Sequence, residues 1–336
     1  MEVAREPVMR PSSTSAYLLD NARKETSKRF DALSVLYDGD TIRHLENRGV
    51  SEDWSCLEVG GGGGSIAAWL AERVGPTGSV LVTDVDPRYL EFLRAQNVEV
   101  QRHNIVTDPL PEAAFDLIHA RLVLMHLPER EQVLARLVTA LKPGGWLVDE
   151  EVDSASLLPD PTVNSSEVFL ETLRALMRLF DDRGVGRRWG RLLFGRLRSL
   201  GLVDVDAEAR ISTWRCGSTG ALMMRANFEQ LREVLIDGGY ISGQEFDRDI
   251  ARLDDPSFMM PSPILWTAWG RRPSLQVKLG NVAAHVDDSL PGYQSLQEES
   301  CNSELHQAVH RELVTERSVT ALLEGAQGSV PPQEAS

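Results

Sequence analysis

The stretch Leu57-Glu58-Val59-Gly60-Gly61-Gly62-Gly63-Gly64-Ser65 decides the fold. A short apolar strand over 56–59 ends in a Gly-x-Gly-x-Gly pattern, and a helical pattern follows from Ile66 to Val74. Glycine has no Cβ, so a ligand can approach the backbone of such a turn closely, and the first N–H groups of the next helix can bind it. Because five consecutive glycines cost backbone entropy, the pattern favours a ligand-binding turn over an ordinary loop.

An acidic residue follows at the spacing that a nucleoside site needs. Asp84 ends the second apolar strand, 79–83, about twenty residues after the last glycine. A carboxylate in this place can accept hydrogen bonds from both hydroxyl groups of a ribose. The turn and Asp84 together therefore predict a site for a nucleoside-containing ligand.

Strand and helix patterns alternate through the first half of the chain. The predicted strands are 56–59, 79–83, 98–102, 115–120 and 146–152, and the predicted helices between them are 66–74, 88–96 and 129–141. Such alternation is typical of a parallel sheet with helices on both faces, which is a doubly wound α/β fold. Later patterns predict helices at 163–180, 187–200 and 221–236 and strands at 203–214 and 264–269.

The spacing of the glycines is compatible with two kinds of nucleoside ligand. A dinucleotide fingerprint requires Gly-x-Gly-x-x-Gly, but counting from Gly60 reaches Ser65 where the third glycine should be. A shifted register, Gly62-x-Gly64-x-x-Ala67, fits a looser variant, so spacing alone does not exclude NAD. Glu58 favours the other alternative, since an acid beside the turn would repel a pyrophosphate and would suit a ligand with a cationic amino group.

Five motifs follow one another in the first half of the chain: Glu58-x-Gly60-x-Gly62-x-Gly64, Asp84-Val85, Asn104-Ile105, Phe115–Ala120 with Leu124–Leu127, and Leu141–Leu147. In this order they make residues 56–150 similar to the core of class I S-adenosylmethionine-dependent methyltransferases, especially the small-molecule branch that includes quinone C-methyltransferases. More loosely, 17–273 resembles uncharacterised actinobacterial methyltransferases. Asn104-Ile105 departs from the family's usual Asp-Ala, although an asparagine can still hydrogen-bond an adenine.

The resemblance implies a Rossmann-like sheet of seven strands, in which the last strand, 264–269, runs antiparallel, with helical additions that form a lid. It implies S-adenosyl-L-methionine as methyl donor and S-adenosyl-L-homocysteine as product. The donor-binding residues that it implies are Tyr17, Glu58, Gly60, Gly62, Gly64, Asp84, Val85, Asn104, Ile105, Ala120 and Arg121. No metal ligand is expected.

The expected reaction is in-line displacement of the methyl group onto a small, hydrophobic acceptor. A general base is needed only if the acceptor atom carries a proton. The candidates are His126, which follows the fourth strand, and Glu150, which follows the fifth at the carboxyl edge of the sheet, where open α/β sheets bind ligands. An NAD-dependent oxidoreductase and a non-methylating protein that binds S-adenosylmethionine remain alternatives.

The chain divides into three predicted parts. Residues 1–50 form a leader and a lid helix, 51–273 form the methyltransferase domain with helical insertions at about 160–185 and 217–255, and 274–336 form an acidic tail. The tail contains a single aromatic residue, Tyr293, and its composition is typical of a flexible segment.

Composition excludes several classes of protein. With 336 residues, a formal net charge of −15 and 42% hydrophobic residues, the chain is an acidic globular protein that is not expected to bind nucleic acid. The three cysteines are far apart, which argues against a disulfide framework. The N-terminal residues do not resemble a signal peptide, and the apolar runs are too short to span a bilayer. A cytoplasmic protein is expected, and a homodimer is compatible with the sequence.

Overall fold

The structure, a computed structural model, describes residues 26–93, 95–157 and 166–274. The chain divides into a unit of residues 1–275 and a unit of residues 276–336. The second unit lies outside the described residues, and so do the predicted leader and Tyr17.

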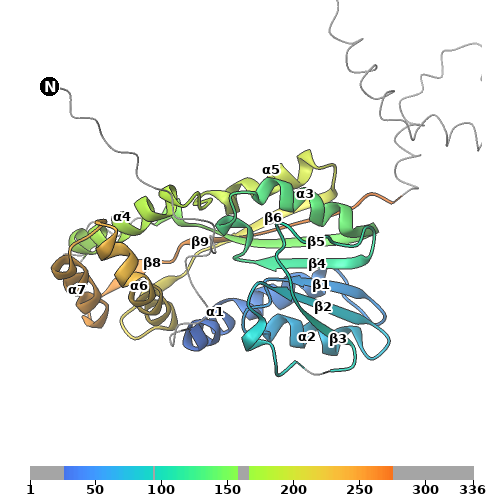
Figure 1. Cartoon of the computed structure of the whole chain (residues 1–336), viewed down its shortest axis with the longest axis horizontal. Helices are drawn as coiled ribbons and strands as arrows, with labels where there is room; N and C mark the ends of the chain where they lie inside the picture. The colour runs from blue at the N-terminus through green and yellow to red at the C-terminus, as the bar shows by residue number, and fades with distance from the viewer. Residues whose placement is uncertain (1–25, 94, 158–165, 275–336) are drawn as a thin grey trace, which may run out of the picture. The chain divides into compact units, whose positions relative to one another are not determined.

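A seven-stranded sheet forms the centre of the first unit, in the order β3-β2-β1-β4-β5-β9-β6 (Figure 1). Strands β1 to β5 are parallel, and β9 is antiparallel to both of its neighbours. The strands are β1 (Ser55–Val59), β2 (Ser79–Asp84), β3 (Val98–Arg102), β4 (Phe115–Arg121), β5 (Leu141–Asp153), β6 (Val203–Arg210) and β9 (Ile264–Arg271). The predicted doubly wound sheet with an antiparallel last strand is therefore confirmed.

Helices cover both faces of this sheet (Figure 1). On one face, α3 (Arg130–Ala140) and α5 (Trp189–Ser199) pack on apolar side chains such as Leu57 and Leu147. On the other face, α1 (Thr26–Asn47) and α2 (Ser65–Val74) pack on Cys56 and Val148. Alternate residues of a strand, here β1, point to opposite faces of the sheet. Glu58 therefore lies on the same side of the sheet as helices α1 and α2.

A third apolar cluster lies beyond the carboxyl ends of the parallel strands. It is built from α4 (Ser166–Asp182), α6 (Thr219–Asp237) and α7 (Gly243–Ala251), with the short ribbon β7 (Thr213–Arg215) and β8 (Met259–Pro261). These helices stand at the left of Figure 1, beside α1. The sequences between the strands thus fold into a helical cap next to the sheet.

Two of the predicted elements differ from the structure. The helix predicted at 88–96 is only a 3₁₀ turn, Pro87–Tyr89, because Leu90 is buried while Phe92 is 61% exposed, so the segment has no continuous apolar face. The strand predicted at 203–214 is divided at Ile211 and Ser212 into β6 and β7, which belong to different sheets. Neither difference concerns the glycine turn, residues 60–64.

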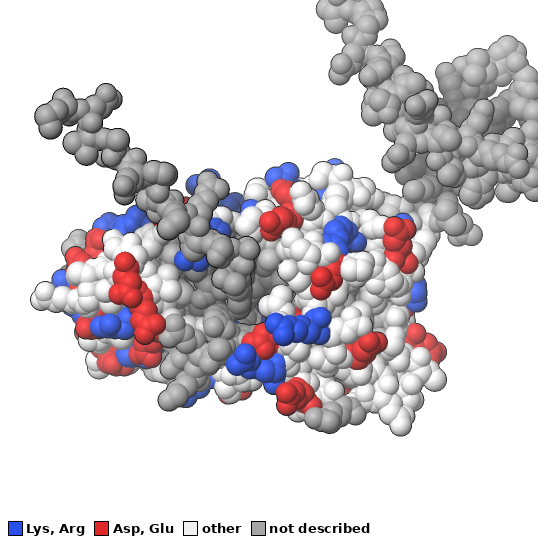
Figure 2. All heavy atoms as spheres, in the orientation of Figure 1, with Lys and Arg blue, Asp and Glu red and all other residues white. Residues whose placement is uncertain are grey.

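Charges are mixed on the surface. The face in Figure 2 shows acidic and basic side chains interspersed over both the sheet and the cap. Within the described residues, no helix is both long enough and apolar enough to span a membrane.

Candidate functional site

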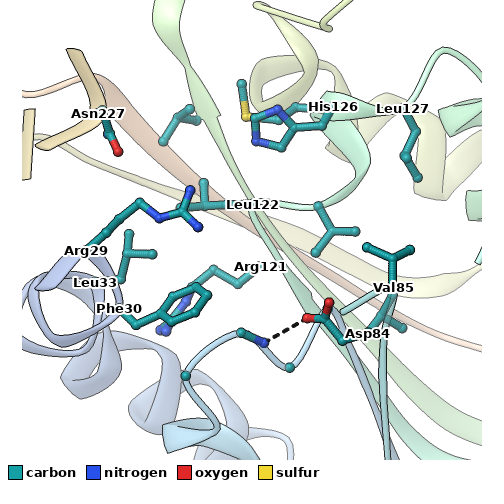
Figure 3. A pocket seen from close by; sticks show the side chains of 18 of the residues that line it. Arg29, Phe30, Leu33, Asp84, Val85, Arg121, Leu122, His126, Leu127 and Asn227 are labelled. Atoms are coloured by element: carbon teal, nitrogen blue, oxygen red, sulfur yellow. Dashed lines mark hydrogen bonds between the residues drawn. The ribbon is translucent and has the colours of Figure 1, made fainter. Parts of the chain in front are cut away.

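A cavity of about 980 Å³ opens at the carboxyl ends of β1, β2, β4 and β5. Helices α1, α4 and α6 contribute the opposite wall. This volume lies at the upper end of the range for small-molecule sites, so the cavity has room for more than one ligand moiety. Figure 3 shows side chains from α1, the glycine turn, β4 and α6 converging on it.

The glycine turn forms the floor of the cavity. Gly60 and Gly62 have positive φ angles of 68° and 53°, and the N–H of Gly60 donates to the carbonyl of Thr83 at 2.8 Å. A Cβ on Gly60 would lie 2.4 Å from Val123, so the turn has no space for a side chain there. Both the backbone conformation and the packing therefore require glycine.

Asp84 lies beside this turn, at the end of β2. One carboxylate oxygen accepts from the N–H of Gly62 at 3.1 Å, and the other accepts from the N–H of Asp86 at 2.9 Å (Figure 3). Burial raises the pKa of Asp84, while the two backbone hydrogen bonds oppose that rise. Each oxygen keeps a further lone pair, so the carboxylate can still accept hydrogen bonds from a ligand.

The donor residues implied by the resemblance do not all meet the cavity. Those that line it are Glu58, Gly60, Gly62, Asp84, Val85, Asn104, Ile105 and Arg121. Gly64 is the N-cap of α2, where its φ of 80° sets the chain direction, and Ala120 is fully buried in the core of the sheet. Neither of these two belongs to the cavity wall.

A buried chain of charged groups runs behind the glycine turn. Nδ1 of His119 lies 2.6 Å from a carboxylate oxygen of Glu58, and Nε2 lies 3.4 Å from a carboxylate oxygen of Glu150. Burial alone would lower the pKa of His119, but the two carboxylates outweigh burial and raise this pKa to about 9. At neutral pH the imidazole of His119 is therefore a cation, and it lies between the carboxyl groups of Glu58 and Glu150.

Glu150 does not reach the cavity. Its carboxylate is fully buried and accepts hydrogen bonds from Thr41 and, at 2.7 Å, from Thr267. Burial raises the pKa of Glu150, but His119 more than offsets this, and the resulting pKa is about 2. A carboxylate held in this way is a poor base and is remote from a substrate, so the sequence-based choice of Glu150 as a catalytic residue is not supported by its position.

Arg121 connects the end of β4 to α1. Its guanidinium donates to Asp38 at 2.9 Å and to the hydroxyl of Thr41 at 2.9 Å. Since Thr41 also donates to Glu150, one polar network ties α1 to the sheet next to the cavity.

His126 faces the cavity from the short 3₁₀ helix Leu124–His126 (Figure 3). Burial, with smaller contributions from the nearby charges of Arg29 and Arg130, lowers the pKa of His126 to about 4. The imidazole is neutral at physiological pH, so it can accept a proton or a hydrogen bond but is a weak base.

Sequence patterns did not single out three further residues of the cavity wall. Arg29, only 3% exposed, and Phe30 come from α1, and Asn227 comes from α6 (Figure 3). Phe30 covers the glycine turn, since a Cβ on Gly63 would lie 2.8 Å from it. All three residues sit inside helical patterns, where a sequence carries no signal for a binding role.

Residues 57–149 match the family model described as "Methyltransferase domain". Residues 57–149 are a methyltransferase domain. The matched residues contain the glycine turn, Asp84, the fourth strand and His126, which are the features that surround one half of the cavity.

Curated relatives are similar to part of this chain. Methyltransferase str2 of Strobilurus tenacellus is 33% identical over 138 residues, which are 41% of this chain and 49% of the relative. Methyltransferase str3 of the same fungus is 37% identical over 98 residues, 29% of this chain and 35% of that one. The ubiquinone/menaquinone biosynthesis C-methyltransferase UbiE of Hahella chejuensis is 26% identical, over 36% of this chain and 57% of the relative. The chain thus spans between 35% and 57% of the length of these relatives.

A solved structure resembles the fold over a larger share. Phosphoethanolamine N-methyltransferase 2 of Haemonchus contortus aligns with a TM-score of 0.50 and 15% identity, covering 78% of this chain and 61% of that protein. At this identity, the resemblance concerns the fold alone.

Proposed function

We propose that this protein transfers a methyl group from S-adenosyl-L-methionine to a small, mainly apolar acceptor. The observation that carries the proposal is the continuity of the cavity: the glycine turn and Asp84 form one end, and an apolar chamber under the cap forms the other. A nucleoside donor and a second molecule can therefore meet without crossing solvent.

Residues at the donor end of the cavity fit S-adenosyl-L-methionine. Gly60 and Gly62 line the cavity with bare backbone, since a Cβ there would meet Val123 or Phe30, and Asp84 has lone pairs for the ribose hydroxyls. Val85 and Ile105 would pack against the adenine, and the side chain of Asn104 lies at the same end of the cavity. These contacts support S-adenosylmethionine, which is also the ligand of the Haemonchus protein in the structure to which this fold is similar.

The other end of the cavity favours an apolar acceptor. Its wall comes from α1, α4 and α6 and from the segment after β5, and its apolar members are Leu33, Leu157, Leu173, Leu176, Met177, Phe180, Met223, Met224 and Phe228. Flexible methionine side chains adapt to irregular ligands. A chamber of this kind suits a small hydrophobic molecule better than a polypeptide or a nucleic acid.

The role of the chain in the chemistry is mainly alignment. When bound, the sulfonium donor supplies a methyl group that is already activated for transfer. The protein then has to hold an acceptor atom in line with the carbon–sulfur bond and keep water out, which supplies several kcal/mol of the barrier. The cap over the cavity performs the second task, and Arg121 and the glycine turn hold the floor.

Binding measurements test the proposal. Isothermal titration calorimetry of the full-length protein with S-adenosylmethionine, S-adenosylhomocysteine, NAD and NADP should show saturable binding of the first two alone. Binding of NAD or NADP instead would mean that the shifted glycine register is the correct one and that the protein is an oxidoreductase. Tight binding of S-adenosylmethionine without turnover on a broad acceptor panel would favour a non-methylating role.

A further inference from the structure

We propose, on the basis of the proposed function, that Asp108 selects the base of the methyl donor. Its carboxylate accepts a hydrogen bond from the 6-amino group of adenine, and the side chain of Asn104 donates to a neighbouring ring nitrogen. Hydrogen bonds within the turn 104–108 determine this division of roles, because they occupy the amide oxygen of Asn104 and place the carboxylate of Asp108 beside it.

The turn 104–108 lies on the side of Asp84 to which the base of a bound nucleoside extends. Strand β3 is the neighbour of β2, and the N–H of His103 donates to the carbonyl of Asp84 at 2.8 Å. The sulfonium of the donor has to face the acceptor end of the cavity, which lies on the opposite side, beyond β1 and β4. A ribose held by Asp84 therefore directs its base toward Asn104 and Asp108, which both line the cavity.

The side chain of Asn104 presents a donor to the cavity rather than an acceptor. Its Oδ1 accepts from the backbone N–H of Val106 at 3.0 Å, which closes a local turn of the kind that asparagine favours. That contact also identifies which end of the amide is the oxygen, since an N–H faces it. The amide nitrogen is left for a ligand, and because it only donates, it suits a ring nitrogen of adenine but not the amino group.

Asp108 supplies an acceptor next to this amide. One carboxylate oxygen accepts from the backbone N–H of Asn104 at 2.8 Å, and the other accepts from the hydroxyl of Thr107 at 3.0 Å. These two hydrogen bonds, the one from Asn104 first, lower the pKa of Asp108, so the group is a carboxylate at neutral pH. Each oxygen keeps a further lone pair, and a carboxylate only accepts.

The two side chains together match the hydrogen-bonding pattern of adenine. Adenine carries an amino group, which donates, next to ring nitrogens that accept. Guanine has a carbonyl oxygen in place of the amino group, as hypoxanthine does, and that oxygen would direct its lone pairs at the carboxylate of Asp108. The turn therefore favours adenine over the 6-oxopurines.

The test compares two ligands that differ only at position 6 of the purine. S-adenosyl-L-homocysteine carries the amino group, and S-nebularinyl-L-homocysteine carries a hydrogen atom in its place. Calorimetry of the full-length protein measures the dissociation constant of each at pH 7.5. We expect the wild type to bind the nebularinyl ligand about 10-fold more weakly, because a hydrogen bond to a charged acceptor is lost.

Variants of the turn assign this preference to one residue. Asp108→Ala should reduce the ratio of the two dissociation constants to about one. Asp108→Asn, which keeps an acceptor oxygen, should leave a ratio of about 3 and decides the question if the alanine variant does not fold. Asn104→Ala should weaken both ligands and leave the ratio near that of the wild type. Glu112→Gln, at an exposed position outside the cavity wall, should change neither affinity.

Failure of this proposal can be separated from failure of the proposed function. If neither ligand binds, the proposed function is wrong. If both ligands bind the wild type equally well, or if the ratio is unchanged in the Asp108 variants, recognition of adenine by Asp108 is wrong and donor binding stands. A ratio that is lost in Asn104→Ala and kept in Asp108→Ala would assign the amino group to Asn104 and overturn the proposal.

Discussion

At the scale of single residues, Gly62 and Asp84 make the donor site sensitive to small changes. Gly62 has a left-handed backbone, and a Cβ there would lie 3.2 Å from the ring of Phe30. We expect Gly62→Val to abolish detectable binding of S-adenosylhomocysteine, since the side chain would fill the ligand space and strain the turn. Asp84→Ala should weaken binding by about 10- to 100-fold, or about 1.4 to 2.8 kcal/mol, through the lost ribose contacts.

Calorimetry on both variants checks this prediction. Asp86→Ala is a suitable control, because Asp86 lies two residues further on and its side chain contacts Arg88 rather than the cavity. Wild-type affinity in both Gly62→Val and Asp84→Ala would show that the donor site lies elsewhere.

His119 offers a prediction about pH. Its pKa in the folded protein, about 9, lies above the value of about 6.5 in an unfolded chain, so its stabilising contribution is complete below pH 6.5 and is lost as the pH rises through 9. His119→Gln leaves the carboxylates of Glu58 and Glu150 buried without their cation, at a cost of about 3 to 5 kcal/mol at pH 7. Melting temperatures measured at pH 6, 8 and 10 should show the gap between wild type and variant narrowing with pH. A constant gap would mean that His119 is neutral.

From residue types and spacing, positions at the cavity were most readily predicted where the backbone itself constrains the residue type. Gly60, Gly62 and Asp84 stand out because a turn and a strand end demand them, and the structure places them together at the cavity. Arg29 and Asn227 did not stand out, since one inward position on a helix is not distinguishable from its neighbours by pattern. Glu150 was expected at the cavity, but successive residues of a strand point to opposite faces of the sheet, so Glu150 and Glu151 lie on different sides. The contact between Glu150 and His119, which the sequence does not reveal, shows on which side Glu150 lies.

At the scale of elements, α1 is the part of the wall most open to perturbation. It covers the glycine turn through Phe30 and is tied down by the Arg121–Asp38 ion pair and the Ser34–Ser65 hydrogen bond. We expect Arg121→Gln to release the helix partly, lowering hydrogen-exchange protection over 26–47 and weakening S-adenosylhomocysteine binding about 3- to 10-fold. Because the Arg121–Asp38 pair is largely buried, removing it should have a larger effect than removing an exposed ion pair.

The same helix supplies the comparison for that experiment. Arg43→Gln removes the exposed Arg43–Glu208 pair, which should leave both exchange and affinity nearly unchanged. Equal effects of the two substitutions would show that α1 is held by its apolar contacts rather than by the network around Arg121.

Elements were predictable where local pattern and packing agree. The strands β1, β2 and β4 and the helix α2 have continuous apolar faces, and the structure contains them near the predicted bounds. The segment 88–96 has helix-forming residues but lacks an apolar face, so tertiary packing leaves it as a turn. The cap was expected as helices, but its β7–β8 ribbon depends on a pairing between residues that lie far apart in the sequence, which local patterns do not reveal.

At the scale of the whole molecule, strand β5 contributes to the apolar clusters on both faces of the sheet, and its residues Asp149, Glu150 and Glu151 are all fully buried. Of these three acids, Glu150 is the one that forms an ion pair with a cation, His119, within the described part of the chain. Burial raises the pKa of Asp149 to about 8, and neither of its side-chain oxygens has a hydrogen-bond partner among the described residues. The free energy of unfolding therefore depends on whether the carboxyl group of Asp149 is protonated.

Protonation of Asp149 makes the folded protein less stable at higher pH. An aspartate in an unfolded chain has a pKa near 3.9, so between pH 4 and 8 the folded protein must bind a proton that the unfolded chain does not, and stability falls as the pH rises through this window. Asp149→Asn removes the requirement and should stabilise the protein by about 1 to 3 kcal/mol at pH 8, with little gain at pH 4. Urea unfolding at the two pH values measures the difference, and Asp237→Asn, at the exposed end of α6, serves as control. Because the His119 contribution is common to wild type and variant, a gain that is the same at both pH values would show that Asp149 is ionised in the folded state.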